Sequence, residues 1–217
     1  MKISALCVTR GNAELLGRAI KCFRRQTEPS RELVIVHQGL DFNVENIPPN
    51  ERYIEQPKGL TLGELRNVAM EEARGEYVMQ WDDDDWYHPH RMQMQLDAIG
   101  FRGAVLLRRW YIFDQLTGKS YISFDRPGGW EGSVLMLRSA ALAIRYPHTS
   151  KGEDSQFMAR FNTRYRVKRI NYPWLYTYVI HGGNTWDRQH FERILAQSVE
   201  NLHGSYKNQI LSMSGMP

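Results

Sequence analysis

The first hundred residues alternate short apolar runs with amphipathic stretches. The apolar runs predict strands at residues 2–9, 33–36, 53–55 and 77–81. Helical spacing of apolar side chains predicts one helix over 13–26 and a second that begins with a capping box at Thr61 and ends at Gly75. On the first helix, Arg18 falls among the charged positions of the polar face, which predicts contact with solvent. Alternating strands and helices predict a parallel α/β sheet.

The pattern is looser beyond residue 100. Apolar runs predict strands at 105–113, 121–124, 133–137, 167–170 and 175–180, with the first two joined as a hairpin. Helical spacing predicts helices over 153–162 and 188–203, the latter with Phe191, Ile194, Leu195 and Val199 on one face. We therefore expect the second half of the chain to be mixed or antiparallel.

Polar residues stand at the carboxyl ends of the predicted parallel strands, which is the edge where α/β sheets bind their ligands. The segments at these ends are 9–12 (TRGN), 37–39 (HQG) and 82–85 (DDDD). We expect the functional site to lie where these segments meet.

Composition narrows the class of protein. A chain of 217 residues, 42% of them hydrophobic and 24% charged, can bury one sizeable core, which excludes disorder and coiled coil for the whole chain. No apolar run reaches the ~18 residues of a membrane span, and the N-terminus leads into a strand instead of a signal peptide. We expect a cytoplasmic protein. Cys7 and Cys22 fall on apolar positions and are expected to be buried and unbridged.

The formal net charge of +4 is unevenly distributed along the chain. Residues 1–101 carry a net charge of −4 and the remaining residues +8. Part of this excess comes from Arg160, Arg164, Arg166, Lys168 and Arg169. Such a basic segment suits an anionic acceptor, either a lipid diphosphate at a membrane surface or an acidic polysaccharide. The structural alternative is a charged face in contact with solvent.

Four consecutive aspartates, Asp82–Asp85, are the strongest chemical feature. Adjacent carboxylates repel and raise one another's pKa unless a cation lies among them. Carboxylate oxygens suit hard divalent ions, and magnesium-type sites combine one or two carboxylates with phosphate oxygens. The cluster therefore predicts a metal-bound phosphorylated substrate. Its structural alternative is an acidic helix N-terminus before Pro89.

Four segments, in order, resemble GT-A-fold glycosyltransferases, in particular the large inverting family 2. They are 63–69 (GELRNVA), 75–86 (GEYVMQWDDDDW), 152–154 (GED) and 181–185 (HGGNT). The resemblance runs from residue 2 to about 184 and implies an α/β fold, a GT-A (Rossmann-like) mixed sheet flanked by helices in a single domain. It further implies that residues 1–101 bind a nucleotide-sugar donor and 102–204 an acceptor, with 205–217 as a C-terminal tail.

The resemblance also implies roles for individual residues. Asp154 would be the catalytic base, and Glu153 would orient the acceptor or the loop that carries Asp154. Asp84 and His181 would ligate a metal, with Asp82 near the metal or the ribose and Asp85 as a substitute for Asp84. Manganese is favoured over magnesium, because carboxylate with imidazole suits it better. The remaining implied donor-binding residues are Thr9, Arg10, Gln38, Arg66, Asp83 and Trp130.

Each of these positions also has a structural interpretation. His181 fits a hydrogen-bonded surface histidine, the pair 153–154 an acidic first helical turn, and Trp130 a core residue. The family usually places an acidic residue after the second strand, whereas this chain has His37-Gln38-Gly39. Because a carboxamide both donates and accepts, Gln38 suits uridine and guanosine equally well.

The resemblance implies a metal-dependent enzyme that transfers a sugar, with inversion, from a nucleoside-diphosphate sugar to a hydroxyl of a glycan, glycolipid or polysaccharide. Peripheral contact with the inner face of the membrane is a further expectation. No nucleic acid is expected, because four aspartates at the ligand edge repel phosphates. Two alternatives stay open. They are a sugar nucleotidyltransferase, whose Gly-rich, Lys-bearing loop is missing here, and a non-catalytic carbohydrate- or nucleic-acid-binding module.

Overall fold

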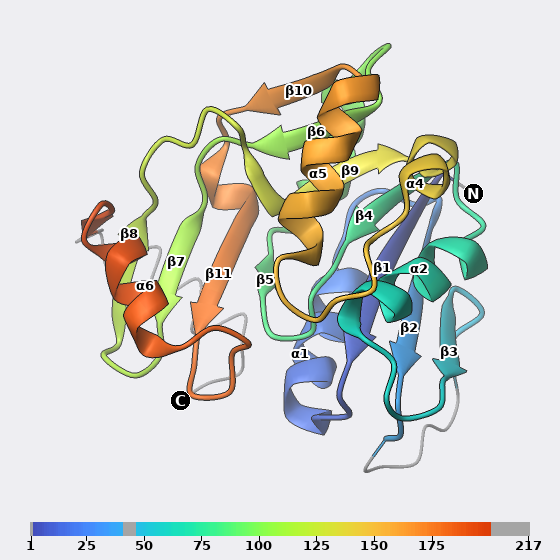
Figure 1. Cartoon of the computed structure of the whole chain (residues 1–217), viewed down its shortest axis with the longest axis horizontal. Coiled ribbons are helices and arrows are strands. Elements are labelled where there is room, and N and C mark those ends of the chain that lie inside the picture. The colour runs from blue at the N-terminus through green and yellow to red at the C-terminus, as the bar shows by residue number, and fades with distance from the viewer. Residues whose placement is uncertain (1, 41–46, 201–217) are drawn as a thin grey trace.

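The computed structural model describes residues 2–40 and 47–200, which form two sheets and the helices around them (Figure 1). The larger sheet has seven strands, and neighbouring strands run parallel except where β9 pairs with β4 and β6. In spatial order its strands are β10 (Val167–Ile170), β6 (Ala104–Leu107), β9 (Trp130–Leu137), β4 (Tyr77–Gln80), β1 (Ile3–Thr9), β2 (Arg31–His37) and β3 (Glu51–Glu55).

A second sheet of five strands stands beside the first. In spatial order its strands are β12 (Val199–Glu200), β8 (Lys119–Ile122), β7 (Tyr111–Asp114), β11 (Tyr176–Ile180) and β5 (Trp86–Tyr87). Strands β7 and β8 form the hairpin predicted around residues 114–119. Because β5 follows the four aspartates directly, the second sheet is joined to the first at the predicted site.

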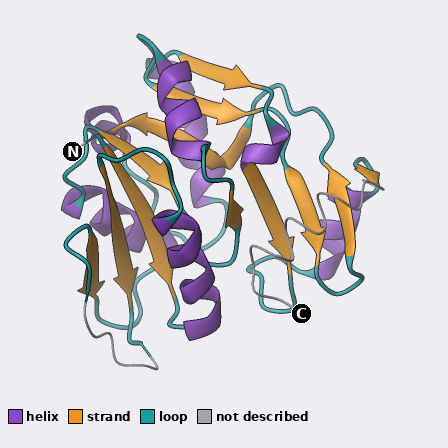
Figure 2. Ribbon diagram, turned by 180° about the vertical axis from the view of Figure 1, so that it is seen from behind, coloured by secondary structure: helices purple, strands orange, loops and turns teal. Residues whose placement is uncertain are grey.

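Helices cover both faces of the larger sheet (Figure 2). They are α1 (Ala13–Arg24), α2 (Leu62–Glu72), α3 (Arg91–Ile99), α4 (Arg138–Ile144) and α5 (Glu153–Arg164). Helix α6 (Arg188–Leu195) lies against the second sheet, and a 3₁₀ turn spans Pro173–Leu175. One core cluster joins the apolar faces of α1 and α3 to the second sheet, and the other joins those of α2, α4 and α5. Strand β1 shows why its sequence is continuously apolar: Ile3, Ala5 and Cys7 face the first cluster, and Leu6 faces the second.

The N-terminus of α2 is fixed by its own sequence and by a close approach of the backbone. The predicted capping box is present, with the Glu64 amide donating to Thr61 Oγ1 at 3.3 Å and the Thr61 amide to Glu64 Oε2 at 2.8 Å. A Cβ atom at Gly63 would lie 1.9 Å from the carbonyl oxygen of Pro147. Only glycine therefore lets α2 pack against the loop of residues 146–152.

The alternating βα pattern of the first hundred residues is confirmed, whereas two predictions for the rest are wrong and one helix was missed. The run 105–113 is two strands, β6 and β7, because the polar pair 108–109 crosses from one sheet to the other. The last helix ends at Leu195, and Val199 lies in β12 with 71% of its surface exposed. Helix α4 was not predicted. The tail assigned to 205–217 lies outside the described residues.

Both cysteines are buried and unbridged, as predicted, and burial raises the pKa of each thiol. Across residues 2–40 and 47–200, every helix is too short or too polar to cross a bilayer.

Candidate active site

A cleft of about 560 Å³ opens at the carboxyl ends of β1, β2 and β4 and is closed on its far side by the loop that follows β11. Gly11, at φ +95°, lets the ends of β1 and β2 meet there, since a Cβ would lie 2.7 Å from the Gly39 carbonyl oxygen. Ten of the eleven residues predicted for the site line the cleft: Arg10, Gln38, Arg66, Asp82, Asp83, Asp84, Trp130, Glu153, Asp154 and His181. The eleventh, Thr9, is hydrogen bonded to one of them.

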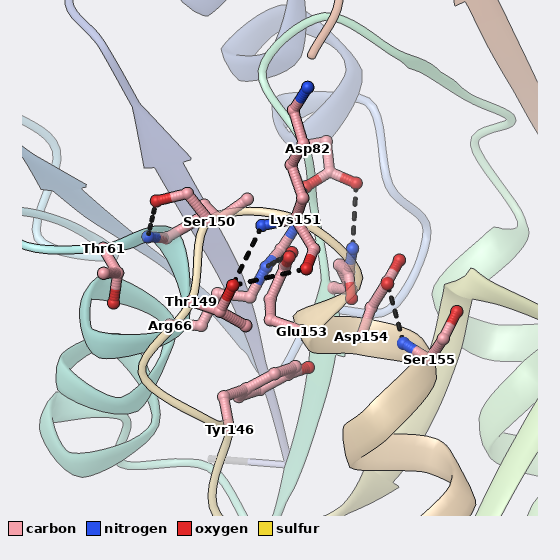
Figure 3. A network of polar contacts seen from close by, with 12 residues as sticks. Thr61, Arg66, Asp82, Tyr146, Thr149, Ser150, Lys151, Glu153, Asp154 and Ser155 are labelled. Carbon is pink, nitrogen blue, oxygen red and sulfur yellow. Dashed lines mark hydrogen bonds and ion pairs between the residues drawn. The ribbon is translucent and has the colours of Figure 1, made fainter. Parts of the chain in front are cut away.

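Arg66 forms the centre of a buried ionic network that joins three segments (Figure 3). Its Nη2 lies 3.0 Å from Asp82 Oδ1, and its Nε lies 3.2 Å from Glu153 Oε1. Burial alone would lower the pKa of the guanidinium, but these carboxylates raise it, so Arg66 stays charged. Burial also raises the pKa of Glu153, against the effect of Arg66. The network fixes the first aspartate of the cluster to the start of α5.

The loop of residues 146–152 is held by α2, which places Asp154 at the cleft. The carboxamide of Asn67 accepts from the Tyr146 amide at 2.8 Å and donates to the Tyr146 carbonyl at 3.0 Å. Gly152, at φ +69°, turns the chain into α5, where Asp154 is half-buried. Its Oδ1 accepts from the Ser155 amide at 2.7 Å (Figure 3). Asn67, the residue after Arg66 on α2, therefore has a structural role: it holds the loop that leads to Asp154.

Asp83 is half-buried at the floor of the cleft. Thr9 Oγ1 donates to Asp83 Oδ2 at 2.5 Å. Burial, reinforced by the carboxylates of Asp84 and Asp82, raises the pKa of Asp83 to about 7. A site that holds three further carboxylates beside this one favours a cation among them.

Asp84 and His181 are in contact within the cleft, with Oδ2 and Nε2 3.1 Å apart. The Asn184 amide nitrogen lies 3.3 Å from the same Oδ2 and supports this geometry. A carboxylate oxygen and an imidazole nitrogen so placed fit a divalent cation that takes its remaining ligands from a phosphorylated substrate. In the part of the chain that the structure describes, no third His, Cys, Asp or Glu completes a ligand cluster.

Asp82 and Asp85 are engaged differently from Asp84. Asp82 Oδ1 accepts from Arg66, and its Oδ2 accepts from Gln80 Nε2 at 3.0 Å. Asp85 is 1% exposed, and its two oxygens accept from the Val179 amide at 2.9 Å and from the Tyr176 hydroxyl. Burial, together with the neighbouring aspartates, raises the pKa of Asp85. Asp85 therefore ties the aspartate loop to β11, the strand that leads to His181.

Trp130 lines the cleft and belongs to an aromatic cluster. Its ring stacks on Trp110 at a centroid distance of 4.6 Å and meets Tyr178 edge-on at 5.6 Å. Its buried Nε1 has no hydrogen-bond partner among the described residues. Trp130 is therefore both a member of an aromatic cluster and a residue that lines the cleft.

The structure adds three residues that sequence reasoning missed or misplaced. Lys151 lines the cleft and lies 5.5 Å above the Trp186 ring, so the loops 146–152 and 181–187 meet over the site. Arg18 is only 7% exposed and lines the cleft, which corrects its expected place on a solvated face. The helical pattern alone cannot show this, because it treats every charged side chain as outward-facing.

Comparison with known proteins identifies the family. Residues 4–195 match the profile of glycosyl transferase family 2. EpsH of Bacillus subtilis is 25% identical over 211 aligned residues, which cover 82% of this chain. The chain spans 61% of the length of EpsH.

Solved structures show the same fold at low sequence identity. TarS of S. aureus (residues 1–349), in complex with UDP-GlcNAc, superposes with a TM-score of 0.70 at 16% identity, covering 97% of this chain and 70% of TarS. The mannosyltransferase PcManGT of Pyrobaculum calidifontis, in complex with GDP-Man and Mn²⁺, gives a TM-score of 0.64 at 14% identity, covering 90% and 62% of the two chains. The predicted single-domain GT-A fold, with a mixed sheet flanked by helices, is confirmed. With a family profile matched over residues 4–195, the chain belongs to glycosyl transferase family 2, a family of glycosyltransferases.

Proposed function

We propose that the chain transfers a sugar, with inversion, from a nucleoside-diphosphate sugar to a hydroxyl group of a glycan or lipid-linked acceptor, with a divalent cation. The observation that carries the proposal is the convergence of Asp84, His181 and Asp154 in one cleft at the carboxyl ends of the parallel strands. Family membership favours this reaction over a nucleotidyltransferase or a binding module.

In the proposed reaction Asp154 is the general base. Its carboxylate takes the proton of the acceptor hydroxyl while the acceptor oxygen bonds to the anomeric carbon. The bond from that carbon to the donor phosphate breaks, and its electron pair leaves with the nucleoside diphosphate. Asp154 suits this role because it lines the cleft half-buried and forms no ion pair with Arg66, unlike its neighbour Glu153.

Glu153 and Arg66 are assigned to positioning. Arg66 is bonded to Asp82 and Glu153 at once, so its charge is already balanced by protein carboxylates. The pair therefore holds the start of α5, and with it Asp154, against the aspartate loop. Stabilisation of the leaving diphosphate has to come from other groups.

The donor nucleotide is proposed to lie along the ends of β1 and β2. Gln38 Nε2 donates to the Pro57 carbonyl at 2.6 Å, which leaves the carboxamide oxygen as an acceptor for a base N–H. Arg10 lines the same wall, and Thr9 holds Asp83 below it. Trp130, on the opposite wall, offers an aromatic face to a sugar ring.

Asp84 and His181 are the proposed metal ligands, and the donor set favours Mn²⁺ over Mg²⁺. When bound, the cation would act as a Lewis acid toward the diphosphate. PcManGT, a structural neighbour, was solved with Mn²⁺ and GDP-Man.

Thermal unfolding with nucleoside diphosphates tests the donor site. A ligand at about 100 times its Kd adds ~2.7 kcal/mol to the free energy of unfolding, which for a domain of this size raises Tm by roughly 5–10 °C. We expect this shift for one of UDP, GDP, CDP, ADP and TDP, with Mn²⁺ present. Asp84→Ala should lose the part of the shift that depends on Mn²⁺.

The matched control is Asp97→Ala, which removes an exposed aspartate on α3 away from the cleft. It should respond to nucleotide and Mn²⁺ as the wild type does. No shift with any nucleoside diphosphate, with or without Mn²⁺, would contradict the proposed function. An equal Mn²⁺ effect in Asp84→Ala would contradict the metal assignment alone.

Peripheral membrane contact is proposed through the basic segment of α5 and β10. Arg164 and Arg166 are exposed there, and the nearby Phe101 is exposed over its whole surface. Each basic side chain near an anionic membrane contributes about 1 kcal/mol. Replacing Arg166 and Lys168 together by Ala should therefore weaken binding to phosphatidylserine vesicles by roughly 30-fold in a sedimentation assay.

A double variant with the same charge change provides the control: Lys21→Ala on α1 with Arg25→Ala at its C-cap, because both side chains are exposed and lie away from α5 and β10 in the sequence. It should bind vesicles like the wild type. If the wild type fails to sediment with anionic vesicles, the membrane proposal is wrong.

A further inference from the structure

Arg18 is a buried cation that forms no ion pair with the described residues. Its side chain leaves α1 in the middle of the helix and is 7% exposed. Its Nε and Nη1 have no hydrogen-bond partner anywhere in residues 2–40 and 47–200. Burying a charge in this way is costly unless an opposite charge meets it, so the fold retains an unfavourable group at this position.

No carboxylate in the described part of the chain forms an ion pair with Arg18. Asp82 is bonded to Arg66 and Gln80, and Asp85 to Val179 and Tyr176. Asp84 has His181 and Asn184 as its partners. Glu14, one turn before Arg18 on the same helix, is exposed. Because no carboxylate among the described residues pairs with Arg18, its unmade hydrogen bonds are open to an anionic ligand.

The position of Arg18 links it to the proposed donor site. Arg18 lines the same cleft as Asp84 and His181, together with Asn12 and Leu15 from the start of α1. The next residue on the helix, Ala19, accepts at its carbonyl a hydrogen bond of 3.2 Å from Trp81 Nε1. Trp81 directly precedes Asp82, so this turn of α1 is fixed against the base of the aspartate loop.

We propose that Arg18 binds the diphosphate of the donor, an assignment that rests on the proposed function. A guanidinium presents planar N–H donors that match phosphate oxygens, and Nε and Nη1 of Arg18 are two such donors without a partner among the described residues. When the bond between the anomeric carbon and phosphate oxygen breaks, the electron pair stays on the diphosphate. The N–H groups of Arg18 then stabilise the added negative charge without transferring a proton. Arg18 takes this role instead of Arg66, because the Arg66 guanidinium is already paired with Asp82 and Glu153.

An arginine that binds diphosphate and an arginine that only supports the fold differ in what the loss of the charge should do to stability and to ligand affinity. Arg18→Met keeps the length of the side chain and removes an unpaired buried charge, so Tm without ligand should stay the same or rise. Affinity for UDP or GDP, whichever the wild type binds, should fall roughly 10- to 100-fold. Affinity for the corresponding nucleoside should not change, and Arg18→Lys should recover part of the loss.

Isothermal titration calorimetry on the whole chain, with and without Mn²⁺, provides the measurement. The ligands are UDP, GDP, uridine, guanosine and inorganic pyrophosphate. Arg25→Met supplies a control with the same change at the exposed C-cap of the same helix. A matching loss for nucleoside diphosphate and pyrophosphate supports the assignment. The assignment is wrong if Arg18→Met binds both nucleoside diphosphate and pyrophosphate as tightly as the wild type. It is also wrong if Arg18→Met has a lower Tm and loses as much affinity for the nucleoside as for the nucleoside diphosphate.

The outcome also separates this inference from the proposed function. If the wild type binds no nucleoside diphosphate, the proposed function fails and the role of Arg18 fails with it. If the wild type and Arg18→Met bind nucleoside diphosphate equally, the role of Arg18 alone fails. In that case the buried charge belongs to another anion, such as a phosphate of the acceptor.

Discussion

Asp154→Asn is expected to lower kcat for sugar transfer by about 1,000-fold while the Kd of the donor nucleotide stays within about twofold. The amide keeps the size of the side chain and its contact with the Ser155 amide, but it cannot take the proton of the acceptor hydroxyl. Asp154 forms no ion pair in the Arg66 network, so Tm should not change. Initial rates of transfer and calorimetric titration with nucleotide measure the two parts of the prediction.

Glu131 provides the matched control for this variant. Its carboxylate lies 3.4 Å from the Ser155 hydroxyl and is paired with Arg126, and burial raises its pKa. It therefore lies near Asp154 without belonging to the residues that line the cleft. Glu131→Gln should keep most of the activity. Near-full activity of Asp154→Asn, with loss in Glu131→Gln, would move the base assignment to Glu131.

Asp85→Ala should produce the largest loss of stability among the aspartate variants. It leaves the Val179 amide and the Tyr176 hydroxyl buried without their acceptor. Two unsatisfied donors cost about 3 kcal/mol together, which lowers Tm by roughly 6–12 °C for a domain of this size. Asp85→Asn, which keeps one acceptor oxygen, should lose less than half as much.

This pair of variants also distinguishes an anchor from a metal ligand. If Asp85 only fixes β11, Asp85→Asn should show the same Mn²⁺-dependent nucleotide shift as the wild type. Loss of the Mn²⁺ effect in Asp85→Asn, at unchanged Tm, would show that Asp85 takes part in the metal site. Differential scanning fluorimetry records Tm and the shift in one experiment.

The sequence predicts the first half of the fold well because its signals are local. Strands β1 and β2 are buried on both faces and read as unbroken apolar runs, and the Thr61 capping box sets the start of α2. The division of 105–113 between two sheets depends on distant partners, since the amide of Arg108 bonds to the carbonyl of Ile170. The seven-residue helix α4 has no side-chain cap and gives no comparable signal.

The residues of the candidate site are likewise predicted where the sequence signal is local and missed where it depends on distant segments. Strand ends and motif order predict which residues meet in the cleft, and ten of them line it. The sequence cannot tell Asp84 from Asp85, because four identical side chains differ only in what faces them after folding. It also cannot show that Arg18 is buried beside the cleft, because many residues that line the cleft with it come from segments far along the chain.

The two sheets also divide the walls of the cleft between them. The wall proposed to bind the nucleotide follows β1, β2 and β4, whereas Gln115, Gly183 and Trp186 follow β7 and β11 of the second sheet. Loops on separate scaffolds can change independently of one another. Chimaeras that exchange the segment from β11 to α6 between family members should therefore acquire a new acceptor range and keep their nucleotide. The Asp85 anchor to Val179 has to be carried across in every such graft.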